Sequence, residues 1–351
     1  MEAFVYASHA MRVRFERGCR SRVAEEAELL GLKNAMVLST PEQEGQASEI
    51  SDALGKRSAG VLAVARMHTP TDVTERAVDE LAKVGADGTV GFGGGSTIGL
   101  GKAIAIRTGI PQIAIPTTYA GSEMTPILGQ TKNGVKSTLR DARVVPACVL
   151  YDVECTLTLP PAASANSGLN AIAHAVEGLY SRDRNPISKL QCVDAVRALI
   201  EALPVVAKRP GDIEARQKAQ YGAFLCGLAL GHSGMALHHK LCHVLGGAFD
   251  LPHAETHAVV LPYAAGFNAE AEGLEPIREL FGEAGIGAGL WDFARLLEAP
   301  ASLAEIGMPE SGVEKAADLA VASPYWNPRP FGREDMAGLI GAAFRGARPE
   351  N

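Results

Sequence analysis

The sequence has no excess of basic residues. Its 351 residues include 33 Lys and Arg against 40 Asp and Glu, which gives a formal net charge of −7 with His neutral. A protein that binds nucleic acid or an acidic membrane usually presents a basic face. Both kinds of partner are therefore disfavoured, whereas a small anionic ligand is not, because local charge decides its binding.

The six cysteines form no C-x-x-C pair, and they lie apart in apolar contexts. This spacing is typical of buried thiols in a reducing compartment rather than of a disulfide framework. The N-terminus also lacks a basic segment followed by an apolar one, so no signal peptide is predicted. We therefore expect a cytoplasmic protein.

No stretch of the sequence is typical of a membrane-spanning helix. Residues 219–249 carry a single formal charge, Lys240, but several glycines and four histidines interrupt them. Histidine is costly in lipid. The stretch therefore predicts buried helices of a globular core.

The first half of the chain predicts a parallel sheet covered on both faces by helices. Short apolar runs alternate there with helical patterns. The predicted strands are 35–39, 60–65, 88–92, 112–115 and 147–151, and the predicted helices include 71–84 and 97–106. Ligands bind such sheets at the carboxyl ends of the strands.

The second half predicts helices almost exclusively. Ala- and Leu-rich helical patterns cover 162–180, 188–203, 213–230, 235–245 and a last segment near 334–344. Since a chain of this length predicts about two domains, we expect an α/β dinucleotide-binding domain over residues 1–158. An all-helical domain then covers residues 159–351.

A glycine-rich loop, Phe92-Gly-Gly-Gly-Ser-Thr97, joins a predicted strand to a predicted helix. Glycines let the backbone approach a bulky ligand, and the helix N-terminus offers free N–H groups to a phosphate. The alternative is a plain tight turn, and the loop is not the G-x-G-x-x-G pattern. The predicted pyrophosphate ligands are Gly93, Gly94, Gly95, Ser96 and Thr97.

A second polar loop and one missing carboxylate refine this prediction. Thr117, Thr118 and Ser122 follow another strand and are candidates to line the same cofactor. Dinucleotide sites often hold the ribose 2′-OH with an acid after an early strand, but Thr40 stands near that turn. Without the acid a 2′-phosphate is not repelled, so we expect both NADH and NADPH to bind.

Six of the nine histidines fall between residues 232 and 257. His239 and His243 have helical i,i+4 spacing, as do Asn170 and His174 in another predicted helix. His253 follows after a turn. Side chains from two helices that converge on one cleft often hold a divalent ion, but residue 170 offers an amide instead of a carboxylate. His9, His68 and His257 are assigned structural or surface roles, and His238 a supporting one.

Together these motifs resemble the iron-containing alcohol dehydrogenase family over nearly the whole chain. The matching pieces are 93–96, 116–123, Asp152 with 158–160, 168–177, 239–243 and 252–253. The resemblance implies an N-terminal dinucleotide-binding α/β domain and a C-terminal helical domain. It also implies an active site in the cleft between them and a homodimer.

In that family an Asp and three His hold the metal, and the matching positions here are Asn170, His174, His239 and His253. His243 matches a histidine near the nicotinamide. Asn170, and Gly99 in place of another common Asp, resemble the branch that reduces maleylacetate. The segments 97–102, 238–240 and 327–330 do so too. The implied activity is NAD(P)H-dependent reduction of maleylacetate to 3-oxoadipate, during degradation of aromatic compounds and without a required metal.

The altered site suits that chemistry. Hydride addition to a C=C conjugated to a ketone spreads the charge into an enolate, which hydrogen-bond donors can stabilise without a metal. We expect His243 to donate the proton or stabilise the enolate, with Asn170 donating a hydrogen bond and the other histidines lining the pocket. Candidate ligands of the substrate carboxylates are Lys136, Lys240, Tyr325 and Arg329.

Three alternatives remain open from the sequence. The first is a metal-dependent alcohol or polyol dehydrogenase of the same family. The second, related by fold alone, is a dehydroquinate-synthase-like lyase that uses NAD transiently. The third is a non-catalytic nucleotide- or metal-sensing protein, against which the pocket histidines and the cofactor loop argue.

Overall fold

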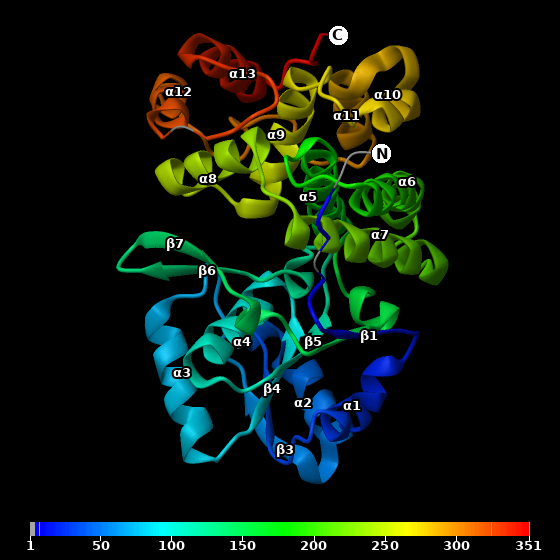
Figure 1. Cartoon of the computed structure of the whole chain (residues 1–351), viewed down its shortest axis with the longest axis vertical. Coiled ribbons are helices and arrows are strands. Elements are labelled where there is room, and N and C mark those ends of the chain that lie inside the picture. The colour runs from blue at the N-terminus through cyan, green and yellow to red at the C-terminus, as the bar shows by residue number, and fades with distance from the viewer. Residues whose placement is uncertain (1–3, 7, 324, 351) are drawn as a thin grey trace. The chain divides into compact units, whose positions relative to one another are not determined.

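A computed structural model describes residues 4–6, 8–323 and 325–350. Two compact units divide the chain between Leu159 and Pro160, and Phe4–Tyr6 belong with the second unit (Figure 1). The ring of Tyr6 lies 5.1 Å from that of His232 within that unit.

The first unit is built on a six-stranded parallel sheet with the order β1-β8-β5-β4-β2-β3. Its strands are β1 (Arg12–Phe15), β2 (Ala35–Leu38), β3 (Ser58–Leu62), β4 (Gly88–Gly93), β5 (Gln112–Pro116) and β8 (Cys148–Tyr151). Its helices are α1 (Val23–Leu29), α2 (Glu44–Leu54), α3 (Thr71–Lys83) and α4 (Gly95–Thr108). The predicted parallel α/β sheet is thereby confirmed.

The central strands are apolar because both faces of the sheet are covered. Successive side chains of β2 point to opposite faces: Val37 packs in the cluster that includes α1 and α2, and Met36 and Leu38 pack with α3 and α4. Every residue of β2, β4 and β5 is buried.

A separate two-stranded hairpin was not expected from the sequence. It pairs β6 (Ile127–Lys132) with β7 (Val135–Arg140) in antiparallel register. Asn133 and Gly134 join the strands with φ angles of 50° and 77°, as a two-residue I′ turn requires. The residues of β7 are mostly exposed and do not alternate between apolar and polar, so the strand carried no periodic signal.

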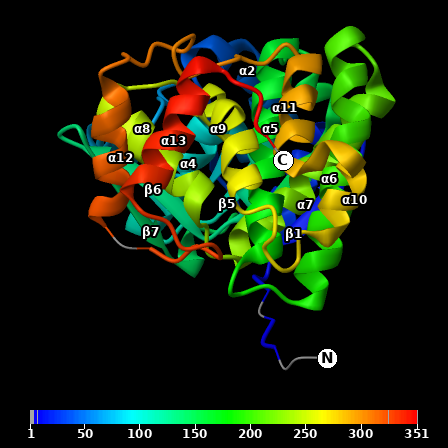
Figure 2. The same cartoon turned by 90° about the horizontal axis from the view of Figure 1, so that it is seen from above.

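The second unit is all helical in the part of the chain that the structure describes. It contains α5 (Pro161–Tyr180), α6 (Pro186–Lys208), α7 (Ile213–His232), α8 (Leu237–Phe249), α9 (His253–Phe267), α10 (Glu275–Phe281), α11 (Gly285–Leu296), α12 (Gly312–Ala322) and α13 (Arg333–Arg345). α5 packs against α6, α7 and α9, whereas α12 contacts both α8 and α13 (Figure 2). No helix among the described residues is long and apolar enough to cross a membrane.

A buried carboxylate fastens the edge strand β1 to α1. Glu26 is fully buried and accepts hydrogen bonds from Arg12 Nε at 2.7 Å and Arg14 Nε at 2.8 Å. Burial opposes ionisation of Glu26, but the two arginines outweigh it and hold its pKa below the usual value of 4.5. The carboxylate therefore stabilises the fold above that pH, and the contribution is lost as the pH falls through the lowered pKa.

Glu26→Gln should lower the free energy of unfolding at pH 7 by about 1–3 kcal/mol, because charge-assisted hydrogen bonds are lost. Urea unfolding followed by circular dichroism measures the change. The difference from the wild type should shrink below pH 4.5. Glu28→Gln is the control, since Glu28 pairs with Arg57 at an exposed position and should change stability by less than about 0.5 kcal/mol. Equal effects of both variants would refute the assignment.

Candidate active site

The glycine loop joins β4 to α4. Gly93 ends the strand with φ of 153°, and an added Cβ there would lie 2.4 Å from Thr97 Oγ1. A Cβ on Gly94 would lie 2.9 Å from Thr118 Cγ2. Packing within the fold therefore requires these two glycines. A Cβ on Gly95, the first residue of α4, would meet nothing within 4 Å.

Other predicted cofactor ligands gather at the same edge of the sheet. Thr117 N–H donates to the Gly93 carbonyl at 3.1 Å, and Thr118 faces Gly94. Gln43 donates from Nε2 to Thr117 Oγ1 at 3.2 Å, from the 3-10 helix Pro41–Gln43. Thr40 immediately precedes that helix, so the carboxyl ends of β2, β4 and β5 meet around the loop. Sequence reasoning missed Gln43, because no motif marks it.

A buried lysine ties α4 to the loop that carries Ser122. Lys102 is fully buried, and its Nζ donates to the carbonyls of Ser122, Thr125 and Ile127 at 2.5–2.9 Å. Burial lowers the pKa of Lys102 to about 7, although Glu123 opposes the shift. The contacts hold the second polar loop against the helix that follows the glycines.

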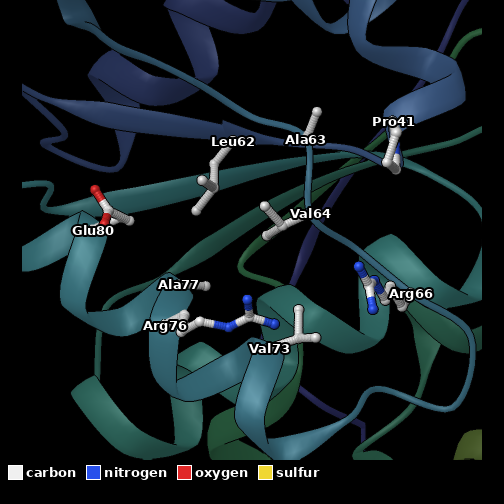
Figure 3. A pocket seen from close by; sticks show the side chains of 9 residues that line it. All are labelled: Pro41, Leu62, Ala63, Val64, Arg66, Val73, Arg76, Ala77 and Glu80. Atoms are coloured by element: carbon white, nitrogen blue, oxygen red, sulfur yellow. The ribbon is translucent and has the colours of Figure 1, made fainter.

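A hollow of about 270 Å³ continues this edge between β3 and α3 (Figure 3). Its apolar wall includes Leu62, Val64 and Val73, and the guanidinium groups of Arg66 and Arg76 lie on it. Pro41 and Arg66 stand at one end and Glu80 at the other. The hollow therefore places an apolar wall and two cations beside the segment that contains Gln43.

In the helical unit, α5, α8 and α9 bring the predicted histidines together. Asn170 and His174 are buried on α5, and the His174 ring lies 4.9 Å from that of His239 on α8. His253 begins α9, and its ring lies 4.3 Å from that of His257. His257, which sequence reasoning left outside the site, is buried 5.0 Å from His239.

Glu177 organises the cluster, and no role was predicted for it. It lies one turn beyond His174 and accepts a hydrogen bond from His239 Nδ1 at 2.6 Å. The backbone N–H groups of Ala236 and His238 donate to it at 3.1 and 2.8 Å. When Nδ1 of His239 carries the proton and donates it to Glu177, the lone pair of the ring lies on Nε2, which has no hydrogen-bond partner among the described residues.

The buried histidines are neutral. Burial, reinforced by neighbouring histidines, lowers the pKa of His174, His239 and His257 well below 6.5. Burial lowers the pKa of His238 to about 4, and its Nε2 lies 3.0 Å from the His257 carbonyl. His243 and His253, by contrast, are exposed.

The predicted metal positions contain no charged ligand. His174, His239 and His253 offer three imidazoles, and Asn170 offers an uncharged amide where a carboxylate would balance the ion. Glu177 already accepts four hydrogen bonds. Among the described residues, His238, His239 and His257 form a close group of three potential ligands, and His238 Nε2 lies 3.0 Å from the His257 carbonyl.

Three of the four candidate carboxylate ligands lie in the helical unit. Lys240 Nζ lies 5.8 Å from the ring centre of Tyr325. Arg329 stacks on Phe267 at 4.0 Å and donates to the Phe267 carbonyl. Lys136 lies exposed on β7 of the first unit. The helical unit therefore pairs Lys240 with Tyr325, and Phe267 holds Arg329.

Gly95→Ala separates cofactor binding from folding. The added methyl meets no protein atom, so the melting temperature should not fall, whereas a pyrophosphate over the loop would contact it. We expect the Kd for NADH, measured by fluorescence quenching, to rise about tenfold or more, equivalent to ~1.4 kcal/mol. Gly45→Ala, at another open position in a helix, should leave both values unchanged. An unaltered Kd in Gly95→Ala would remove the pyrophosphate from this loop.

The chain was compared with known proteins and protein families. The family described as iron-containing alcohol dehydrogenase matches residues 10–153, and the C-terminal part of the Fe-containing alcohol dehydrogenase family matches residues 164–344. A maleylacetate reductase of Rhizobium sp. (strain MTP-10005) is 55% identical, with both chains covered completely. One from Burkholderia cepacia is 49% identical over 99% of this chain and 100% of its own.

Solved structures agree with these relatives. The crystal structure of maleylacetate reductase from Agrobacterium tumefaciens has a TM-score of 0.96 at 55% identity, and the match covers 99% of this chain and 100% of that one. Both halves of the chain match one family, and the sequence identity to full-length relatives is far above the level that indicates common descent. The chain belongs to the iron-containing alcohol dehydrogenase family.

Proposed function

We propose that this protein reduces the conjugated C=C of maleylacetate to give 3-oxoadipate, with NADH or NADPH as the hydride donor. Relatives at 55% and 49% identity over the full chain carry that name. The observation that supports the proposal most directly is the uncharged site: Asn170 lies one turn from His174 on α5, and burial keeps His174 and His239 neutral.

The reaction is a conjugate reduction. Hydride from the nicotinamide forms a C–H bond at the alkene carbon next to the substrate carboxylate. The C=C π electrons move toward the ketone and form an enolate, and a proton then adds to the other alkene carbon. In total the substrate gains one hydride and one proton, and the cofactor is oxidised by loss of the hydride. The charge never rests on one alkoxide oxygen, so hydrogen-bond donors suffice.

The residues of the helical unit take separate roles. Asn170 donates its amide N–H toward the developing enolate, a role that a carboxylate at this position would oppose by repulsion. His243 donates the proton, since it is exposed on α8 and can be reprotonated from water. Glu177 holds His239 in one tautomer, and His174, His239 and His253 line the pocket.

The residues of the first unit hold the cofactor. The loop Gly93–Ser96 with Thr97 takes the pyrophosphate on the N-terminus of α4, and Thr117, Thr118 and Ser122 line it. The hollow beside Pro41 takes the adenosine. No carboxylate lines the hollow near Thr40, and Arg66 stands at that end, which favours acceptance of a 2′-phosphate.

The direct test follows NADH and NADPH absorbance with maleylacetate, before and after dialysis against a chelator. We expect turnover with both cofactors and a kcat that changes less than twofold on chelation. Glycerol and propane-1,3-diol, each with NAD+ or NADP+ and added divalent metal, serve as comparison substrates. Activity on these alcohols with metal, and none on maleylacetate, would instead support a metal-dependent alcohol dehydrogenase.

Asn170→Asp tests whether the neutral amide sets the chemistry. The variant restores a charged metal ligand, so calorimetry with Zn²⁺ should detect binding at least about tenfold tighter than to the wild type. The same charge should lower kcat/KM for maleylacetate by about tenfold or more through repulsion of enolate and dianion. Asn166→Asp, a buried position one turn earlier on α5, is the control and should gain no metal affinity. Unchanged metal binding in Asn170→Asp would contradict the prediction.

A further inference from the structure

A second hollow, of about 680 Å³, lies within the helical unit. It is formed by Arg182, which follows α5, by the end of α12 and by the segment before α13. Its lining includes Arg182, Ala320, Val321, Tyr325, Trp326 and Phe331. Arg182 brings the one formal charge among the lining residues, so the hollow is electropositive with apolar walls.

Arg182 is positioned but not neutralised. Its guanidinium carbon lies 5.0 Å from the centre of the Trp326 ring. Among the described residues no carboxylate forms an ion pair with Arg182, whereas Arg184, two residues along, pairs with Glu272 at 2.6 Å. Stacking fixes the guanidinium plane and leaves its N–H edge available, which is the arrangement that binds a carboxylate in a bidentate manner.

Two further donors are Tyr325, on the segment before α13, and Lys240, on α8. The hydroxyl of Tyr325 is buried and has no hydrogen-bond partner in the described part of the chain. Burial and the nearby Glu177 carboxylate raise the pKa of Tyr325, which keeps the hydroxyl protonated. The Lys240 ammonium lies over the Tyr325 ring. Among the described residues, neither side chain pairs with a carboxylate that would compete with a bound anion.

The hollow is linked rigidly to the histidine cluster. Tyr180 donates to Glu177 at 3.2 Å, and Asn268 donates to Tyr180 at 3.3 Å. The amide groups of Asn268 and Asn327 exchange two hydrogen bonds of 2.9 and 2.8 Å.

We propose that Arg182, with Tyr325 and Lys240, binds the substrate carboxylate that is farther from the reacting C=C. This inference rests on the proposed function and specifies how its site selects dicarboxylates. The carboxylate forms paired hydrogen bonds with the Arg182 guanidinium, beside the apolar walls of the hollow. A substrate without this second carboxylate leaves the guanidinium unpaired.

The test compares Arg182→Gln and Arg182→Lys with the wild type. Arg182→Gln should raise KM for maleylacetate about 10- to 100-fold, the loss expected for a charge-assisted pair, and change kcat by less than about threefold. Arg182→Lys should recover part of the loss. The Kd for NADH should stay constant in both, and Arg184→Gln, which loses only its exposed pair with Glu272, is the matched control.

Inhibition by adipate and by its monomethyl ester separates recognition from folding. The wild type should prefer adipate about tenfold or more, and Arg182→Gln should bind the two almost equally. The inference would be overturned, with the proposed function left intact, by an unchanged KM in Arg182→Gln. It would also be overturned if this variant lost affinity equally for adipate and for its monomethyl ester. Absence of maleylacetate turnover in the wild type would overturn the proposed function, and calorimetry with adipate would still report whether Arg182 binds a diacid.

Discussion

The hydrogen bond from His239 to Glu177 is the contact on which the rest of the helical site depends. A buried carboxylate is costly unless hydrogen bonds satisfy it. Hydrogen bonds to Glu177 from His239, from Tyr180 and from two backbone N–H groups at the start of α8 offset this cost. Three of these bonds, from His239 and the two backbone N–H groups, fix α8 against α5. The position of every imidazole on α8 relative to Asn170 and His174 follows from them.

Local charge, and not the net charge of −7, governs the site. Burial keeps the central histidines neutral, and the one nearby carboxylate is fully engaged. Lys240 and Arg182 supply positive charge towards the periphery. In the proposed reaction a dianion therefore meets no repelling charge among these residues, and the enolate that forms from it gains hydrogen-bond donors.

Much of the fold could be predicted from the sequence, because apolar runs and turn residues mark buried strands. β2, β4 and β5 lie within a residue or two of the predicted segments, as do α3 and α5. The glycine loop was recognisable because its turn residues stand between an apolar run and a helical pattern. β7 was not, because its exposed side chains leave no periodic pattern.

The candidate site was only partly predictable, since its contacts join distant residues. Glu177 meets partners 59–62 positions along the chain, and no local pattern encodes that. His257 was missed because α9 begins at His253, where a loop was expected, so the two share a helix face. Arg182 lies outside every motif, and only the stacking on Trp326 reveals it.

Every residue of α5 from Ser164 to Tyr180 is buried. A helix without a solvent face tolerates few changes of side-chain volume. Aspartate and asparagine are nearly isosteric, so exchange of one for the other at position 170 alters the charge of the site with almost no repacking. The interior of α5 can therefore change between an uncharged amide and a charged metal ligand at position 170 by a single substitution that leaves the packing of the surrounding helices almost unaltered.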